Sequence, residues 1–329
     1  MTNTIDAVPF AKLTPDCILA AIEAADFKVD GRLMALNSYE NRVYQFGLED
    51  GAMQIAKFYR PNRWSNSAIL EEHTFSRALM DAELPIVAPI ANHHGETLHT
   101  FDDFLFAVFP RQGGHAPELD DPDMLNRLGR LIGRIHAIGT LKAYHHRPTL
   151  NIESFGQEPS DYLLNHRWIP DDITDTYRNV VTQALEEAQR CFDRAGDVAL
   201  IRIHGDCYAG NILCMGGHPS LVDFDDSRMG PAVQDLWMLL PGPHDNRLAS
   251  LNELLSGYET FFEFDPRELH LVEALRTLRM IHYSAWLAKR WHDPAFPPTF
   301  PWFAQTSYWV ERIQELKQQV MTMKEPVYI

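Results

Sequence analysis

A change of sequence pattern near residue 111 divides this chain into two parts that should fold differently. The first hundred residues carry short apolar stretches typical of β-strands and a single stretch with helical spacing. Residues 111–123 (RQGGHAPELDDPD) are rich in glycine, proline and acid, as linkers are, and the pattern beyond them is largely helical. A chain of 329 residues is long enough for two domains. We therefore expect an α+β protein with a small β-rich lobe (1–110), a hinge (111–122), a larger, mainly helical lobe (123–329) and a ligand-binding cleft between the lobes.

Individual elements follow from the same patterns. In the first lobe we expect a β-hairpin, one helix and two further strands, at 42–48, 52–59, 67–79, 84–90 and 104–110. In the second lobe the apolar spacing predicts helices at 123–139, 173–196, 234–241, 248–263, 267–291 and 305–323.

Charge and composition exclude several classes of partner. Acidic residues outnumber basic ones 45 to 29, for a net charge of −16, which argues against binding to nucleic acid or to an anionic membrane. The N-terminal stretch MTNTIDAVPFAKL lacks the features of a signal peptide, and no apolar run is long enough for a membrane helix. The four cysteines show no paired C-x-x-C spacing. We therefore expect a cytoplasmic, monomeric protein with no nucleic-acid or membrane partner.

The stretch IRIHGDCYAGNIL (201–213) sets polar side chains between two apolar runs. Strands at 212–215 and 220–224, joined by a turn at 216–219, would bring Asn211 next to Asp223. An amide oxygen and a carboxylate that converge in a cleft suit Mg²⁺. A further aspartate free of the metal, Asp206, could orient a hydroxyl group and accept its proton, as phosphoryl transfer requires. A purely structural explanation is also open, because Gly205 and Gly210 mark turns.

The segment HGDCYAGN resembles the H-G-D-x-x-x-x-N catalytic loop of aminoglycoside-phosphotransferase-like kinases, which are relatives of the eukaryotic protein kinases. VDFDD (222–226) resembles the metal-binding strand end that follows this loop. The resemblance implies a bilobal protein-kinase-like fold that uses ATP and Mg²⁺. It makes Asp206 and Asp223 the catalytic residues and Asn211 and Asp223 the metal ligands. It also implies that Asp235 braces the catalytic loop.

A kinase further needs a lysine on the small lobe to hold phosphates. Lys57 alternates with Ile55 and Tyr59 and should point inward, although a lysine on an edge strand can also reach solvent. In the kinases that the motif resembles, its partner is a glutamate on the next helix. The family's spacing favours Glu72 over Glu71, and the choice between them stays open.

The glycine-rich phosphate loop of such kinases has no counterpart here, because LNSYENRVYQF (36–46) contains no glycine. Ser38 and Asn41 are the expected substitutes as phosphate donors, with a simple turn as the alternative. The resemblance also implies that backbone groups near Phe109 contact adenine. Asp225 stands where the family's D-F-G has glycine, and Asp226 follows it. Both should be structural or solvent-facing, with help to the metal as the alternative.

Longer segments narrow the resemblance. LNSYENRVYQF, KFYRP, ILEEH, GPAVQDLWMLL and AWLAKRWHDPAFPPTFPW are similar to a family of bacterial Ser/Thr protein kinases that act in stress responses, over residues 10–315. The resemblance implies phosphorylation of serine and threonine in proteins, this chain among them, and protection from cell death.

Two other functions stay open. The acidic surface and the aromatic segment WHDPAFPPTFPWF (291–303) would also suit a kinase of a small cationic alcohol or amino sugar. The missing glycine loop would suit a regulatory module that binds ATP without transferring phosphate.

Overall fold

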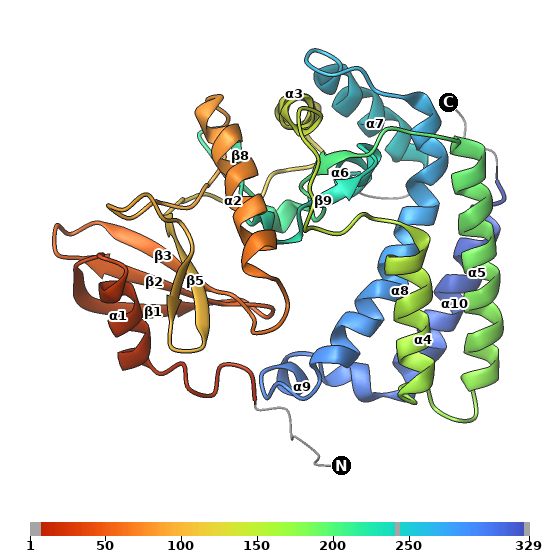
Figure 1. Ribbon diagram of the computed structural model, residues 1–329. Helices are drawn as coiled ribbons and strands as arrows, with labels where there is room; N and C mark the ends of the chain where they lie inside the picture. The colour runs from red at the N-terminus through yellow and green to blue at the C-terminus, as the bar shows by residue number, and fades with distance from the viewer. Residues whose placement is uncertain (1–7, 241–243, 326–329) are drawn as a thin grey trace.

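Five antiparallel strands form the first lobe, which we call the N-lobe (Figure 1). The computed structural model describes residues 8–240 and 244–325. The strand order is β1-β2-β3-β5-β4, and the predicted hairpin is present as β2 and β3. The strands are β1 (Val29–Leu36), β2 (Arg42–Leu48), β3 (Met53–Phe58), β4 (His99–Phe101) and β5 (Phe104–Pro110).

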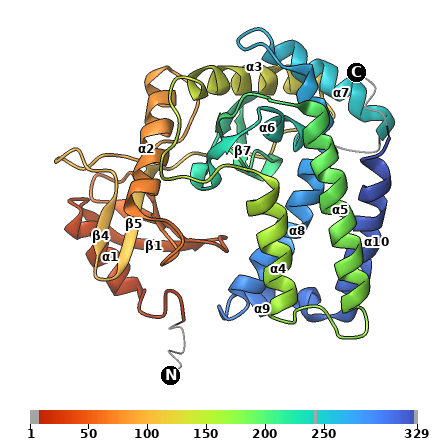
Figure 2. The same ribbon diagram turned by 45° about the vertical axis from the view of Figure 1, so that its right-hand side comes forward.

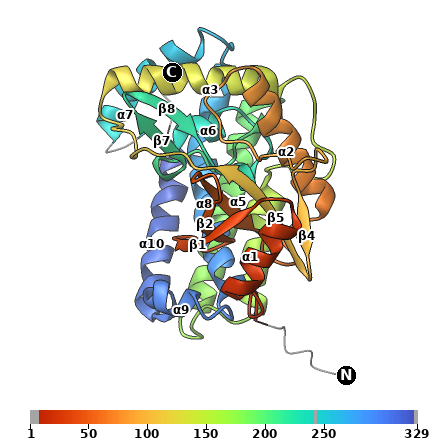
Figure 3. The same ribbon diagram turned by 90° about the vertical axis from the view of Figure 1, so that its left-hand side faces the viewer.

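Two helices, rather than the single one expected, pack on this sheet: α1 (Pro15–Ala24) and α2 (Asn66–Asp81). The hydroxyl of Thr14 caps α1, and Pro15 stands at its first position, where its missing N–H costs nothing. Ile18 and Ile22 bury the inner face of α1 against strand residues such as Phe46. Figure 3, in which the N-lobe faces the viewer, shows α1 in front of the strands.

The helix α2 packs into the cores of both lobes. Ile69 lies with Tyr59 in a small cluster against the sheet. About two and three turns later, Phe75 and Leu79 enter the large core of the helical lobe. Because one rigid helix contributes to both cores, its position relative to the two lobes is fixed from both sides.

The expected strand at 84–90 is wrong. This segment forms only an isolated bridge from Ile86 to Leu221 and a few single hydrogen bonds, such as Val87 N to Leu221 O. Pro85 and Pro89 have no N–H to donate, so the segment cannot complete a ladder with a neighbouring strand. It crosses from one lobe to the other as extended chain.

The second lobe, the C-lobe, is mainly helical, as predicted. Its helices α4, α5, α8 and α10 run side by side, and α3 packs against α7 (Figure 2). The α-helices are α3 (Pro122–Gly139), α4 (Glu158–Asn165), α5 (Thr174–Ala195), α6 (Val233–Trp237), α7 (His244–Tyr258), α8 (Val272–Arg290), α9 (Phe296–Thr299) and α10 (Thr306–Thr322). A π-helix η1 (Glu153–Gln157) precedes α4, and 3-10 helices η4 (Pro266–Leu271) and η5 (Pro301–Ala304) precede α8 and α10.

Several predicted limits differ from the observed ones. The helix expected at 234–241 ends at Trp237, and residue 241 lies outside the described residues. The N-terminal stretch in which we expect no signal peptide lies outside them at residues 1–7. The helix expected at 267–291 begins as a 3-10 turn, and the one expected at 248–263 is α7, which begins and ends earlier. β5 ends at Pro110 and α3 begins at Pro122; the domain limits at 110 and 122 themselves stay predictions. None of the described helices has the length and apolarity needed to cross a membrane.

Two small two-stranded antiparallel sheets lie where the lobes meet. β6 (Ile201–Ile203) pairs with β9 (Arg228–Gly230), and β7 (Ile212–Met215) pairs with β8 (His218–Leu221). The predicted returning strand at 220–224 is therefore displaced. Gly216 and Gly217 both have positive φ angles, 59° and 78°, which permit a two-residue turn in place of the four-residue turn expected. The 3-10 helices η2 (Ala209–Asn211) and η3 (Phe224–Asp226) complete this region.

The loop between β1 and β2, residues 37–41, is bonded to the C-lobe. The carboxylate of Glu40 accepts hydrogen bonds from Trp286 Nε1 and Arg290 Nε on α8. Arg42, the first residue of β2, and Arg60, just after β3, both donate to the carboxylate of Asp293, at 3.1 and 2.7 Å. We call these contacts the loop clamp. They join the two lobes through charged groups from both.

We expect Asp293→Asn to lower the free energy of unfolding by about 2 kcal/mol, because it removes the carboxylate that pairs with Arg42 and leaves Arg60 with Glu40 as its remaining carboxylate. Urea-induced unfolding followed by tryptophan fluorescence measures the change. The control is Asp175→Asn, which breaks an exposed pair with Arg178 and should cost less than about 0.5 kcal/mol. Equal losses in the two variants would contradict the structural role of Asp293.

Candidate active site

The backbone of the predicted catalytic loop is held by one buried carboxylate. Asp235 on α6 accepts hydrogen bonds from the backbone N–H groups of His204, at 2.7 Å, and Gly205, at 2.8 Å. His136 on α3 reaches the same carboxylate at 3.1 Å. Burial opposes ionisation, but these donors lower the pKa of Asp235, so it remains a carboxylate. The bracing contact that the resemblance implied is present, and His136 takes part in it.

His204 joins the catalytic loop to the segment that carries Asp223. Its Nε2 lies 2.9 Å from the carbonyl oxygen of Val222, and its Nδ1 accepts from the backbone N–H of Asp206 at 3.3 Å. The ring packs against Phe224 with 4.6 Å between centroids. Gly205, at φ 85°, has no room for a side chain, since a Cβ there would meet the carbonyl oxygen of Asp226 at 2.3 Å.

The three predicted polar residues converge as the hairpin implied. Asn211 Nδ2 donates to the backbone oxygen of Asp206 at 3.0 Å and to its carboxylate at 3.3 Å. Val222 N donates to the carbonyl oxygen of Asn211, which brings Asp223 alongside. Asp223 adopts φ 60°, a strained conformation for a residue other than glycine and one that is concentrated at functional sites.

The environments of the two aspartates differ. The side chain of Asp206 is 22% exposed and ion-paired with Arg279 on α8 at 2.8 Å, whereas that of Asp223 is 49% exposed. Burial raises the pKa of Asp206, and Arg279 opposes that rise. Asp206 is thus a shielded carboxylate suited to proton transfer, and Asp223 is the accessible one.

Asn211 and Asp223 fit a magnesium ion by the chemistry of their donors. The amide nitrogen of Asn211 is used on Asp206, which leaves its amide oxygen as a ligand atom. The carboxylate of Asp223 supplies the second hard oxygen, and Mg²⁺ takes one or two carboxylates with water and phosphate for the rest. Asp225 and Asp226 are structural, because Arg63 pairs with both of them.

Lys57 lies among three carboxylates, of which those of Glu72 and Asp225 are buried. Its Nζ is 3.5 Å from Glu72, 3.3 Å from Asp223 and 3.9 Å from Asp225, and its side chain is 7% exposed. Burial alone would lower the pKa of Lys57, but these carboxylates hold it well above its ordinary value, so the side chain is charged.

The structure distinguishes the two candidate partners of Lys57. Glu72 pairs with Lys57 and with Arg147. Glu71 instead accepts hydrogen bonds from three consecutive backbone N–H groups, at residues 145–147. The sequence pattern could not separate two adjacent glutamates whose partners lie far apart in the chain.

The glycine-free loop is shaped by side-chain hydrogen bonds. The hydroxyl of Ser38 donates to the carbonyl oxygen of Asn41 at 2.7 Å. The amide of Asn41 donates to Asp225 and accepts from the backbone N–H of Arg60, both at 3.1 Å. The Asn41 side chain is therefore engaged within the protein, and its contact with phosphate stays a prediction. Phe109, at the end of β5, places its ring 5.1 Å from Lys57 Nζ.

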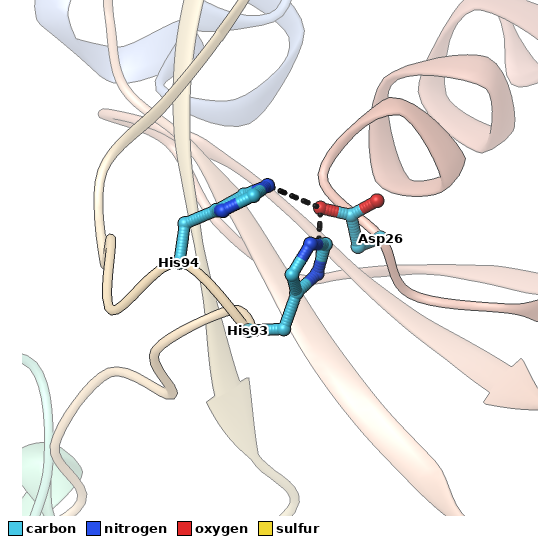
Figure 4. Close-up of side chains that lie close together, drawn as sticks. All are labelled: Asp26, His93 and His94. Carbon is cyan, nitrogen blue, oxygen red and sulfur yellow. Dashed lines mark ion pairs between the residues drawn. The ribbon is translucent and has the colours of Figure 1, made fainter.

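A second group of possible metal ligands lies outside this centre. Asp26, after α1, lies 3.0 Å from His93 and 4.0 Å from His94, and all three are exposed on the N-lobe (Figure 4). The ion pairs account for their proximity, and none of them contacts the Lys57 group.

Comparison with known proteins adds three findings. Residues 33–272 match the phosphotransferase enzyme family. The chain is 41% identical over 320 residues to stress response kinase A of Escherichia coli K12, covering 97% of this chain and 96% of that protein. It is 40% identical over 321 residues to a Salmonella typhimurium protein named serine/threonine protein kinase RdoA, covering 98% and 97%.

Among solved structures, a microcompartment-associated aminopropanol kinase has a TM-score of 0.73 at 18% identity, covering 94% of this chain and 99% of that chain. The amicoumacin kinase hAmiN, solved with AMP-PNP, Ca²⁺ and Ami, has a TM-score of 0.70 at 20% identity, covering 91% and 93%. The bilobal protein-kinase-like fold expected from the sequence is confirmed.

The helix that carries Asp235 is itself held by a buried acid. Glu268 on η4 accepts a hydrogen bond from Val233 N, in the first turn of α6, at 2.7 Å. Burial raises the pKa of Glu268 to about 7, above its ordinary value of 4.5. Between these two values the unfolded chain loses the proton while the folded protein keeps it, so stability falls as the pH rises through this range.

We therefore expect the free energy of unfolding of the parent protein, relative to Glu268→Gln, to fall by up to about 3 kcal/mol between pH 4.5 and 7.5. Urea unfolding of both proteins across this range measures the difference. The control is Glu311→Gln, which removes a carboxyl group at an exposed position on α10. A flat difference for Glu268→Gln would show that this carboxyl group is not perturbed.

Proposed function

Because the chain belongs to the phosphotransferase enzyme family, we propose that it transfers the γ-phosphoryl group of ATP to the hydroxyl group of serine or threonine in proteins. The observation that carries the proposal is the convergence of Asp206, Asn211 and Asp223 with the Lys57–Glu72 pair at the junction of the lobes. The proposed physiological setting is the bacterial stress response, which the name of the Escherichia coli relative mentions.

Each residue has a role that its surroundings support. Asp206 orients the acceptor hydroxyl group and takes its proton as the oxygen bonds to phosphorus and the bond to the ADP oxygen breaks. Asn211 and Asp223 hold Mg²⁺, which when bound neutralises charge on the phosphate oxygens. Lys57 binds phosphate oxygens, and Glu72 keeps its ammonium group in place when Asp223 turns to the metal. Ser38 and Asn41, in the loop between β1 and β2, are the proposed phosphate donors. Backbone groups near Phe109 are the proposed adenine contacts.

A protein acceptor is favoured by the extent of one match. The Salmonella relative named as a serine/threonine protein kinase aligns with 98% of this chain, so the likeness includes the C-lobe, where an acceptor would bind. Transfer to the chain itself is part of the proposal, because serine and threonine occur throughout it.

A small-molecule acceptor is the second candidate. The aminopropanol kinase and the amicoumacin kinase share the fold over more than nine tenths of this chain. Their identities of 18% and 20% leave the acceptor of this chain undetermined.

The test is incubation of the purified protein with γ-labelled ATP and Mg²⁺, alone, with a basic protein such as myelin basic protein, and with a panel of amino alcohols and amino sugars. We expect label on protein serine or threonine, reduced at least about 1,000-fold in Asp206→Ala and in Asp223→Ala. ATP binding should be largely intact in Asp206→Ala, because Asp206 acts on the acceptor. Asp175→Ala, at an exposed position on α5, is the matched control and should keep full activity.

The other outcomes separate the alternatives. ATP consumed only in the presence of a small alcohol would replace the protein kinase by a metabolite kinase. ATP bound tightly without transfer to any acceptor would indicate a regulatory module.

A further inference from the structure

One arginine of the C-lobe lies directly on the proposed catalytic carboxylate. Arg279, in the middle of α8, approaches Asp206 Oδ1 with its Nη2 at 2.8 Å. Its side chain is 38% exposed. Seven and eleven residues further along, Trp286 and Arg290 contact Glu40 in the loop clamp. These spacings put Arg279 on the same face of α8 as Trp286 and Arg290, the face that contacts the loop clamp and the catalytic loop.

This ion pair works against the role proposed for Asp206. The pair occupies Oδ1, while Asn211 donates to Oδ2, so an acceptor hydroxyl group has to displace one of them. Asn211 is held a second time by the backbone oxygen of Asp206, and Arg279 is the more exposed and longer side chain. Arg279 is therefore the partner that can leave.

Structural support of the loop does not require Arg279. The backbone before Asp206 is fixed by Asp235, and the backbone after it is fixed by the hydrogen bond from Asn211. The guanidinium group is thus free for another use.

Other cations at the cleft are neutralised by carboxylates that take no part in proton transfer. Lys57 is near Glu72, Asp223 and Asp225. Arg63 and Arg228 both bind Asp226. The charge of Arg279, by contrast, is balanced by the carboxylate that should accept a proton.

The geometry of transfer brings the phosphoryl group within reach of this charge. An acceptor oxygen lies about 2.7 Å from the carboxylate that takes its proton, and the phosphorus lies about 3 Å beyond it before the bond forms. The phosphoryl oxygens are then on the order of 5 Å from Asp206. Rotation of the arginine side chain covers this distance, and a guanidinium group matches phosphoryl oxygens with two parallel donors.

We propose that Arg279 is a catalytic residue that moves from Asp206 to the transferring phosphoryl group when both substrates are bound. The inference rests on the proposed function. In the transfer step the acceptor oxygen bonds to phosphorus, the bond from phosphorus to the ADP oxygen breaks, and the hydroxyl proton passes to Asp206. Departure of Arg279 frees Oδ1 of Asp206 for the acceptor hydroxyl group and supplies positive charge to the phosphoryl oxygens in the same movement.

The first test is kinetic and uses Arg279→Gln and Arg279→Lys, with the acceptor that the wild-type protein labels. We expect kcat to fall at least about 100-fold in Arg279→Gln, with the KM for ATP changed only a few-fold, and an intermediate loss in Arg279→Lys. Arg276→Gln is the matched control: it lies one turn earlier on α8, pairs with Glu273 and stacks on Trp237, and should stay within about 3-fold of wild type.

The pH dependence distinguishes catalysis from simple tuning of Asp206. Without the cation the pKa of Asp206 rises, so the acid limb of the kcat profile moves to higher pH in either case. If Arg279 acts on the phosphoryl group, kcat of Arg279→Gln stays low on the plateau above that limb. Full recovery of kcat on the plateau would overturn the proposal.

The second test needs no acceptor. Calorimetric titration measures binding of ADP with Mg²⁺, in the absence and presence of aluminium fluoride, which imitates the transferring phosphoryl group. We expect fluoride to tighten ADP binding at least about 10-fold in the wild-type protein and in Arg276→Gln, and to have little effect in Arg279→Gln. Equal tightening in Arg279→Gln would overturn the role of Arg279 alone, and no tightening in the wild-type protein would count against phosphoryl transfer itself.

Discussion

Burial of the Lys57 ammonium group between the lobes is the interaction on which the rest of the structure depends. A buried ammonium group costs on the order of several kcal/mol unless carboxylates surround it. The carboxylates here come from α2 in the first lobe and from the segment after β8 in the second. Glu72 compensates part of the charge within the first lobe, and the compensation is complete only when the lobes are together. The same interaction holds Asp223 beside the catalytic loop.

The parts of the site that the sequence predicts well are those made by neighbours in the chain. Asn211 and Asp223 come together because a short hairpin joins them, and the pairing of adjacent strands is a local property. The inward direction of Lys57 follows from two-residue alternation in one strand. The helical character of the second lobe likewise follows from apolar spacing, since each long helix buries one face.

The parts that the sequence does not predict depend on contacts between distant segments. Nothing local to Glu71 and Glu72 says which of them meets Lys57 and which meets the backbone at 145–147. Glu40 and Trp286 are 246 residues apart, and the contact between them exists only because the lobes close on each other. Local signals were also missed: Thr14 and Pro15 mark the start of α1, and the prolines at 85 and 89 argue against a strand.

The loop clamp has a consequence for how this protein can change in evolution. A phosphate loop rich in glycine takes its shape from its own backbone, so it can vary independently of the other lobe. Here the shape depends on Glu40 and its partners on α8, up to 250 residues away. A substitution of Glu40, or of Trp286 or Arg290, leaves a charged or polar group of the other lobe without its partner. The loop and the outer turns of α8 are therefore expected to vary together among relatives, as paired changes rather than single ones.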